Sequence, residues 1–265
     1  MIINRSYPKY LTESCLLTFG LKSVTSESLF KNWTDADISD AQICRIEKGE
    51  IKISGIEEYL AFRETKPRRK FSCCSLDDAL EQKLSGALTA SGTMEVCRRL
   101  GIPYAVSCGI GGIGDIKGEE LCPDLPALRD SGVVLVCTSP KDMLDIEATI
   151  KWLTDNGVKV LGSDTNICTG YIFTGKAVKL DGILKSESKA PLLILNPIQQ
   201  EKRIGERSVL LQAISDAKDA EARGEYYHPA ANASIDRQTQ GYSSEIQLMS
   251  LIDNVALTAK LTANC

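Results

Sequence analysis

The chain has 265 residues, of which 43% are hydrophobic and 25% are charged, as is typical of a globular protein with a sizeable core. A formal net charge of −4, a pI near 5.3 and an aromatic content of 6% argue against a nucleic-acid-binding surface. No apolar run is long enough to cross a membrane, and the first residues lack the apolar core of a signal peptide. We therefore expect a cytoplasmic protein with no nucleic-acid and no membrane partner.

The ten cysteines are less informative than their number suggests. None forms a Cys-x-x-Cys pair, and His228 is the only histidine, whereas zinc sites usually need paired ligands at close spacing. Cys97, Cys108 and Cys137 lie in apolar surroundings, where a thiol behaves as a small hydrophobic group. We expect reduced, structural cysteines.

Short strands and two helices are expected in the first hundred residues. In chain order these are a strand over Cys15–Phe19 after Glu13, a hairpin of 41–46 with 50–54 across Lys48-Gly49, a helix over 77–82, and a helix over 89–100 ended by Gly101 and Pro103.

The remainder of the chain alternates strands with helices. Continuous apolar runs predict buried strands over 105–108, 133–137 and 191–197, and a further strand over 158–162; amphipathic or long helices are expected over 142–156, 208–223 and 243–263. This alternation predicts an α/β protein, specifically an α/β/α sandwich with a mixed, largely parallel central sheet. With no internal repeat and no break in composition, we expect a single domain over residues 1–265.

A glycine-rich loop, Gly109-Ile-Gly-Gly-Ile-Gly114, follows the strand expected at 105–108. It matches the dinucleotide pattern G-x-G-x-x-G, which requires a helix directly after the glycines and an acidic residue at the end of the next strand. Here residues 115–126 contain two prolines, and the next strand ends in Cys137 and Thr138. The loop is therefore more consistent with backbone amides that line a phosphate or carboxylate pocket than with a nucleotide site.

Lys141 stands just past the end of the apolar strand 133–137. In open α/β sheets the chemistry collects at the carboxyl ends of strands, so this position suggests amine chemistry on a phosphorylated carbonyl compound. At a helix start, the positive end of the helix dipole would lower the pKa of the ammonium and favour the nucleophilic amine. The alternative is a surface lysine at a helix start, and the residue pattern alone leaves the two interpretations nearly even.

Other charged residues are ambiguous when taken singly. Lys70 follows two arginines and could be part of a solvated charge run, and Glu13 could be an ordinary acid beside a strand. Glu119, Glu120 and Asp124 could form a solvated loop or a site for a hard cation.

Taken together, these motifs resemble the pseudouridine-5'-phosphate glycosidase family, which also contains C-glycosynthases of natural-product pathways. The matching segments run in consistent order over about residues 10–262. They are Leu11–Gly20, Lys70–Ser72, Thr89–Met94, Gly109–Gly112, Lys141 with Leu144-Asp145, Asn196–Ile198, His228-Pro229, Thr239, Gly241 and Asn254.

The resemblance implies a role for several residues. Glu13 would be the proton donor, Lys141 would form the covalent adduct with the sugar, and Lys70 would contact the substrate. The other implied substrate-binding residues are Thr89, Ala90, Cys122, Pro123, Asp124 and Gln247, and Glu120 would bind a manganese ion. Members of the family cleave pseudouridine 5'-phosphate to uracil and ribose 5-phosphate, and are typically homotrimers.

The chain also departs from the family pattern. Phe19 and Gly114 stand where the family has histidines, and Glu120, Cys122 and Gln247 replace an aspartate, a serine and an asparagine. We expect an enzyme that cleaves or forms a C-glycosidic bond between a nucleobase-like aglycone and ribose 5-phosphate through a lysine imine. Pseudouridine 5'-phosphate is the default substrate. The alternatives are a C-nucleoside synthase with a different aglycone and a non-catalytic descendant that binds sugar phosphates.

Overall fold

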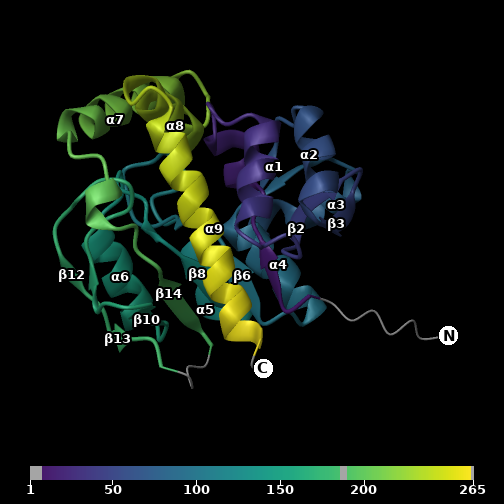
Figure 1. The fold of residues 1–265 in the computed structure, drawn as a ribbon, viewed down its shortest axis with the longest axis horizontal. Helices are drawn as coiled ribbons and strands as arrows, with labels where there is room; N and C mark the ends of the chain where they lie inside the picture. The colour runs from purple at the N-terminus through teal and green to yellow at the C-terminus, as the bar shows by residue number, and fades with distance from the viewer. Residues whose placement is uncertain (1–7, 186–189, 264–265) are drawn as a thin grey trace.

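A ten-stranded, mostly parallel sheet forms the centre of the computed structural model, which describes residues 8–185 and 190–263 (Figure 1). Its strands are β1 Tyr10–Thr12, β2 Ile43–Glu47, β3 Glu50–Ser54, β4 Lys70–Phe71, β5 Gly86–Leu88, β6 Tyr104–Val106, β8 Val134–Cys137, β10 Lys159–Gly162, β13 Gly182–Ile183 and β14 Leu192–Leu195. The order is β13-β10-β14-β8-β6-β1-β2-β5-β4, and β3 pairs with β2. Neighbours from β13 to β2 are parallel, whereas β3 and β5 run antiparallel to β2. The predicted fold class is confirmed.

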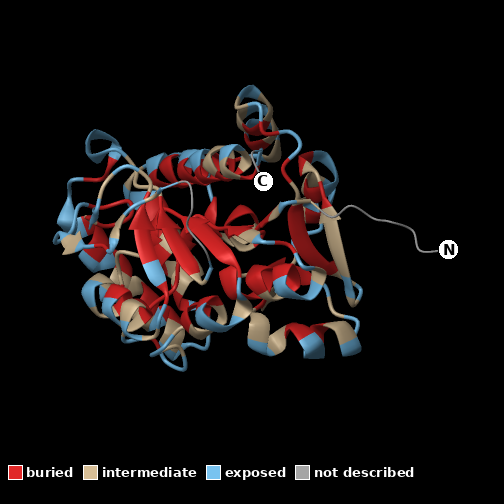
Figure 2. Ribbon diagram, turned by 90° about the horizontal axis from the view of Figure 1, so that it is seen from below, coloured by how far each residue is buried: buried red, intermediate tan, exposed pale blue. Residues whose placement is uncertain are grey.

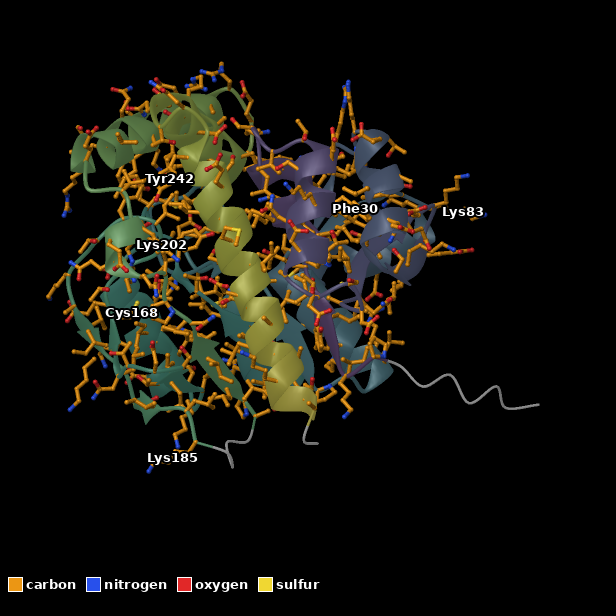
Figure 3. The ribbon with its side chains drawn as sticks, viewed as in Figure 1. Phe30, Lys83, Cys168, Lys185, Lys202 and Tyr242 are labelled. Atoms are coloured by element: carbon orange, nitrogen blue, oxygen red, sulfur yellow. The ribbon has the colours of Figure 1, made fainter. Side chains whose placement is uncertain are left out.

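Helices cover both faces of this sheet (Figure 2). They are α1 Ser26–Asp35, α2 Ile56–Glu64, α3 Leu76–Glu81, α4 Ala90–Leu100, α5 Asp124–Ser131, α6 Ile146–Asp155, α7 Arg207–Ala222, α8 Tyr227–Gln238 and α9 Tyr242–Ala263. Successive strand residues point to opposite faces, so Ala105 belongs to the core between the sheet and α3 to α6, whereas Val106 belongs to the core between the sheet and α1, α2 and α7 to α9. The long helix α9 crosses the second face, and the Tyr242 hydroxyl at its start donates to the Lys202 carbonyl at 2.8 Å (Figure 3).

Two expected elements are corrected by the structure. The apolar run at 15–19 is not a strand, because the chain leaves the sheet after β1 and turns into a short helix, η1 (Leu16–Gly20), which buries Leu16 and Leu17. The helix expected from 142 begins at Ile146, because the Asp145 side chain caps it by accepting the Ala148 N–H at 2.9 Å. The hairpin and the other expected helices and strands are present within one to three residues of their predicted ends. Helices α1, α2, α5 and α8 were not expected.

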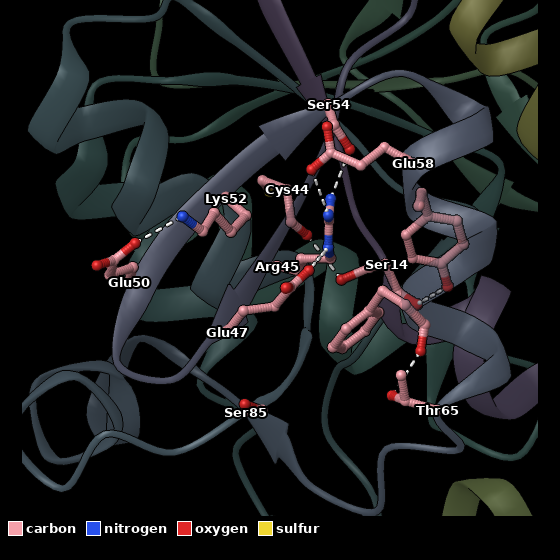
Figure 4. Close-up of polar contacts among 12 residues, drawn as sticks. Ser14, Cys44, Arg45, Glu47, Glu50, Lys52, Ser54, Glu58, Thr65 and Ser85 are labelled. Atoms are coloured by element: carbon pink, nitrogen blue, oxygen red, sulfur yellow. Dashed lines mark hydrogen bonds and ion pairs between the residues drawn. The ribbon is translucent and has the colours of Figure 1, made fainter.

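The buried Arg45 of β2 carries a polar network that reaches Ser54 of β3 and Glu58 of α2 (Figure 4). Arg45 is 1% exposed, and its guanidinium donates to Glu47 Oε1 at 2.5 Å and to Glu58 Oε1 at 2.8 Å. Close by, the Ser14 hydroxyl donates to the Cys44 carbonyl at 2.7 Å and accepts the Leu88 N–H at 3.0 Å. The residue that follows Glu13 is therefore tied to two neighbouring strands.

In the part of the chain that the structure describes, no helix combines the length and apolar character that a bilayer crossing requires. The nine cysteines within these residues are all free thiols.

Candidate active site

A cavity of about 170 Å³ lies at the carboxyl ends of the central strands. Glu13 directly follows β1, Cys108 comes two residues after β6, and Lys141 follows β8 through the short strand β9 (Ser139–Pro140). These three parallel strands are neighbours in the sheet, so their ends meet at the same edge. The end of β5 meets this edge next to Ser14 and brings the start of α4 to the cavity.

The structure places most of the residues expected in the site in the wall of this one cavity. They are Glu13, Lys70, Thr89, Ala90, Cys122, Pro123, Asp124, Lys141 and Gln247. Glu120 is not among the lining residues. These side chains therefore line the same cavity, while the role of each stays a prediction.

Glu13 is set up to hold a proton near neutral pH. Its side chain is buried at 6% exposure, and Oε1 accepts the Cys108 N–H at 3.3 Å. Burial raises the pKa of the Glu13 carboxyl to about 7, and the positive charge of Lys141 limits the rise. A carboxyl group with this pKa can both give and take a proton at physiological pH.

Lys141 does not lie at a helix terminus, contrary to the sequence-based expectation. A turn separates it from α6, and Asp145 occupies the cap of that helix. Burial by itself lowers the pKa of the Lys141 ammonium, but the negative charges around it, Asp124 first and Glu13 among them, raise it above the ordinary value. These surroundings therefore favour the protonated lysine, and the predicted depression of its pKa is wrong.

Asp124 fixes the cavity wall from within. One carboxylate oxygen accepts the Ser91 N–H at 2.8 Å and the other accepts the Gly111 N–H at 2.9 Å. A glycine-loop amide thus binds a carboxylate of the chain itself, so this amide is not free for a ligand phosphate. Gly111 is required by packing, since a Cβ there would lie 2.2 Å from Cys122 Sγ.

A second charged group, Lys70 with Glu119 and His228, lies in the same cavity. Lys70 Nζ is 3.3 Å from Glu119 Oε1 and 4.7 Å from the centre of the Tyr226 ring. His228 Nε2 is 4.0 Å from Glu119 Oε2, and its Nδ1 is buried with no hydrogen-bond partner among the described residues. Burial, with the positive charges of Lys141 and Lys70, holds the pKa of His228 well below 6.5. Sequence reasoning did not assign His228 to the site, and its only signals were its uniqueness and its place in the matched His-Pro pair.

The side chains do not fit a resident metal ion. Glu120 is exposed, and its Oε1 accepts the Gly118 N–H at 3.2 Å. Glu119 faces Lys70 and His228, and both oxygens of Asp124 hold backbone N–H groups. Across residues 8–185 and 190–263, no three His, Cys, Asp or Glu side chains are grouped to hold a metal. The manganese expected from the resemblance stays a prediction.

Asp142, next to the lysine, is a further residue that sequence reasoning missed. Its carboxylate accepts the N–H groups of Tyr171 at 2.7 Å, Ile172 at 2.9 Å and Phe173 at 3.1 Å. The Tyr171 hydroxyl in turn lies 2.6 Å from Cys108 Sγ. Asp142 therefore holds the loop that forms the cavity wall beside Lys141.

These features define the class of the protein: an α/β/α sandwich with a lysine and a protonatable glutamate in the wall of one cavity at the strand ends. Residues 13–264 match the family described as indigoidine synthase A like protein. The chain belongs to this family, which includes pseudouridine-5'-phosphate glycosidases and C-glycosynthases.

Individual relatives agree with this assignment. The pseudouridine-5'-phosphate glycosidase of Staphylococcus aureus (strain MW2) is 27% identical over 235 residues, which cover 80% of this chain and 76% of that protein. The pseudouridine-5'-phosphate glycosidase of Clostridium botulinum (strain Langeland) is 26% identical over 285 residues, which cover 98% and 92%.

Two solved structures share the fold. An indigoidine synthase A-like protein from Thermotoga maritima superposes with a TM-score of 0.82 at 22% identity, covering 97% of this chain and 94% of that one. The prealnumycin C-glycosynthase AlnA, solved in complex with ribulose 5-phosphate, gives a TM-score of 0.75 at 21% identity, covering 96% and 92%.

Proposed function

We propose that this protein breaks or makes a C-glycosidic bond between a nucleobase-like aglycone and ribose 5-phosphate through an imine on Lys141. The observation that carries the proposal is the placement of Lys141 and Glu13 in the wall of one cavity, beyond the carboxyl ends of β8 and β1, the two strands that flank β6. Pseudouridine 5'-phosphate, the substrate named for the relatives, is the default substrate, and the same chemistry run in reverse would join a different aglycone to the sugar.

The residue types suit the cleavage of a carbon–carbon bond. Protonating a leaving oxygen, as ordinary glycosidases do, does not help when the leaving atom is carbon. An amine can instead open the sugar ring and then expel the base carbon as an imine forms. That sequence requires a neutral lysine and a protonated acid in the same cavity.

The Glu13–Lys141 pair can reach this state by moving one proton. The resting pair holds the proton on Lys141, and transfer to Glu13 gives a neutral amine and a carboxylic acid. A bound substrate that displaces water favours the neutral pair, because two charges lose their solvation when the cavity closes over them.

Cleavage then starts from the neutral amine of Lys141 and the protonated carboxyl group of Glu13. The Lys141 amine attacks C1′, the bond from C1′ to the ring oxygen breaks, and Glu13 gives its proton to that oxygen. The Glu13 carboxylate then takes a proton from the new secondary ammonium, which frees the nitrogen lone pair. This lone pair forms the protonated imine as the bond from C1′ to the base carbon breaks, and Glu13 gives its proton to the base carbon. Water hydrolyses the imine, which releases ribose 5-phosphate and returns the free lysine.

Borohydride trapping tests the proposal. The protein incubated with ribose 5-phosphate and reduced should gain the mass of one sugar phosphate, located at Lys141 by peptide mapping. Lys141→Ala should gain none, whereas Lys151→Ala, which removes an exposed lysine of α6, should react like the unaltered protein. An unmodified protein after reduction would overturn the imine mechanism.

A further inference from the structure

We propose that Lys70 and His228 form a two-point clamp for the phosphate group of the substrate, and that Glu119 fills this clamp as an internal anion when the cavity is empty. The inference rests on the proposed function, since it assigns a role within the same sugar-phosphate site.

Three separate elements bring these side chains together. Lys70 begins β4, Glu119 lies in the segment between the glycine loop and α5, and His228 is the second residue of α8. The Glu119 carboxylate spans the two basic groups, with one oxygen 3.3 Å from Lys70 Nζ and the other 4.0 Å from His228 Nε2. A phosphate has the same anionic character as this carboxylate and offers more acceptor oxygens.

His228 is the part of the clamp that the structure leaves unsatisfied. Its Nδ1 is buried and has no hydrogen-bond partner in residues 8–185 and 190–263, and its Nε2 is beyond hydrogen-bond distance of Glu119. Buried polar groups without any hydrogen bond are exceptions that call for an explanation. His228 also lies in the first turn of α8, whose N-cap makes no side-chain hydrogen bond and whose positive dipole end favours a bound anion.

The charges around His228 make its protonation depend on the ligand. It faces Lys70 from β4, Lys141 from the turn after β9 and Glu119 from its loop, and the Tyr227 ring packs against its edge on its own helix. Burial and the two lysines lower the pKa of the imidazole and favour its neutral form. A phosphate monoester carries about −1.5 to −2 charge at pH 7, and an opposite charge within hydrogen-bond range raises a pKa by about 1–3 units. Phosphate binding should therefore raise the pKa of His228 and favour its protonated form.

Because His228 is the only histidine of the chain, its ring signal can be followed by NMR in the tag-free, otherwise unaltered protein. The titration is run with no ligand, with ribose and with ribose 5-phosphate, each with a chelator present. Ribose can also form an imine with Lys141 but has no phosphate. We expect ribose 5-phosphate to raise the pKa of His228 by about 1–3 units and ribose to leave it near its ligand-free value.

Substitution of Glu119 gives an independent test, because the clamp predicts the direction in which the Kd for ribose 5-phosphate changes. As an internal competitor it opposes phosphate binding, so Glu119→Gln should tighten the Kd for ribose 5-phosphate by about 2- to 5-fold, as expected for loss of a partly exposed ion pair. The Glu119→Gln change should have only a small effect on the Kd for ribose, which has no phosphate. Glu225→Gln, at an exposed position just before α8, is the matched control and should change neither Kd.

The outcomes separate this inference from the proposed function. Borohydride trapping of ribose 5-phosphate on Lys141 without movement of the His228 signal would overturn the clamp and leave the imine mechanism standing. Weaker binding by Glu119→Gln would also overturn it, since Glu119 would then be a ligand-binding or metal-binding group. If ribose 5-phosphate gives neither an adduct nor a shift, the proposed function fails and the clamp fails with it.

Discussion

Glu13 and Lys141 are most informative at the scale of the single residue, because the proposed mechanism requires them to share one proton. Below pH 7 both groups are protonated, and no neutral amine is available. Above the Glu13 pKa of about 7 the pair holds a single proton, and the reactive form with that proton on Glu13 becomes accessible. We therefore expect kcat/KM to rise with pH up to about 7 and then to level off.

The Glu13→Gln variant checks this sharing. An amide cannot take the lysine proton, so turnover at pH 7.5 should fall by about 10²-fold or more, while substrate binding persists. The variant should also lose the plateau, with a rate that still increases well above pH 7 as Lys141 loses its proton to solvent. A full rate in the variant would show that another group is the acid.

Asp142 gives a prediction about stability. Burial raises the pKa of its carboxyl to about 6, against the lowering effect of its three backbone hydrogen bonds. Because this folded-state pKa exceeds the ordinary Asp value, the stabilisation that it contributes is full below pH 4 and is lost as the pH rises through 6.

Asp142→Asn should remove that pH dependence and should leave one backbone N–H without an acceptor, at a cost of about 1–3 kcal/mol. Urea unfolding at pH 5 and pH 8 measures both effects. Asp130→Asn, at an exposed position on α5, is the control and should unfold like the unaltered protein. Equal stability of Asp142→Asn and the unaltered protein at both pH values would show that the carboxylate does not hold the Tyr171–Phe173 loop.

At the scale of elements, the glycine loop packs against the start of α5, which in turn holds the start of α4. Gly111 touches Cys122, and its N–H reaches Asp124, whose other oxygen holds the start of α4. Gly111→Ala should push these segments apart and destabilise the fold by about 1–3 kcal/mol, with a lower Tm. Gly205→Ala is the matched control, because its added Cβ would meet nothing within 4 Å. Similar Tm values for the two variants would contradict this role.

At the scale of the whole molecule, we predict the homotrimer that the family resemblance implies. Sedimentation equilibrium of the unaltered protein should give three times the chain mass of 28.9 kDa at micromolar concentration. A monomeric mass would show that the cavity is formed by one chain without residues from a second copy. It would leave the proposed chemistry unchanged, because Glu13, Lys70 and Lys141 all come from the same chain.

Elements with a clear period or a clear stop signal were predictable from the sequence. The apolar run of β8 and the Gly101 stop of α4 are local patterns, and each appears in the structure. The run at 15–19 was misassigned, because an apolar segment of five residues suits either a buried strand or a buried helical turn. The chain leaves the sheet after β1, and this tertiary feature makes the segment a helical turn and not a strand.

For the candidate site too, some features were predictable from the sequence and others depended on the tertiary structure. By itself the sequence determined the candidate residues and the family: a lysine past a strand end, an acid after the first strand and a motif order that resembles one family. Tertiary structure decided what surrounds them. The raised pKa of Lys141, the internal use of Asp124 and the meeting of Glu119 with His228 all depend on residues far apart in the chain. Electrostatic effects act through space, so spacing along the sequence does not reveal them.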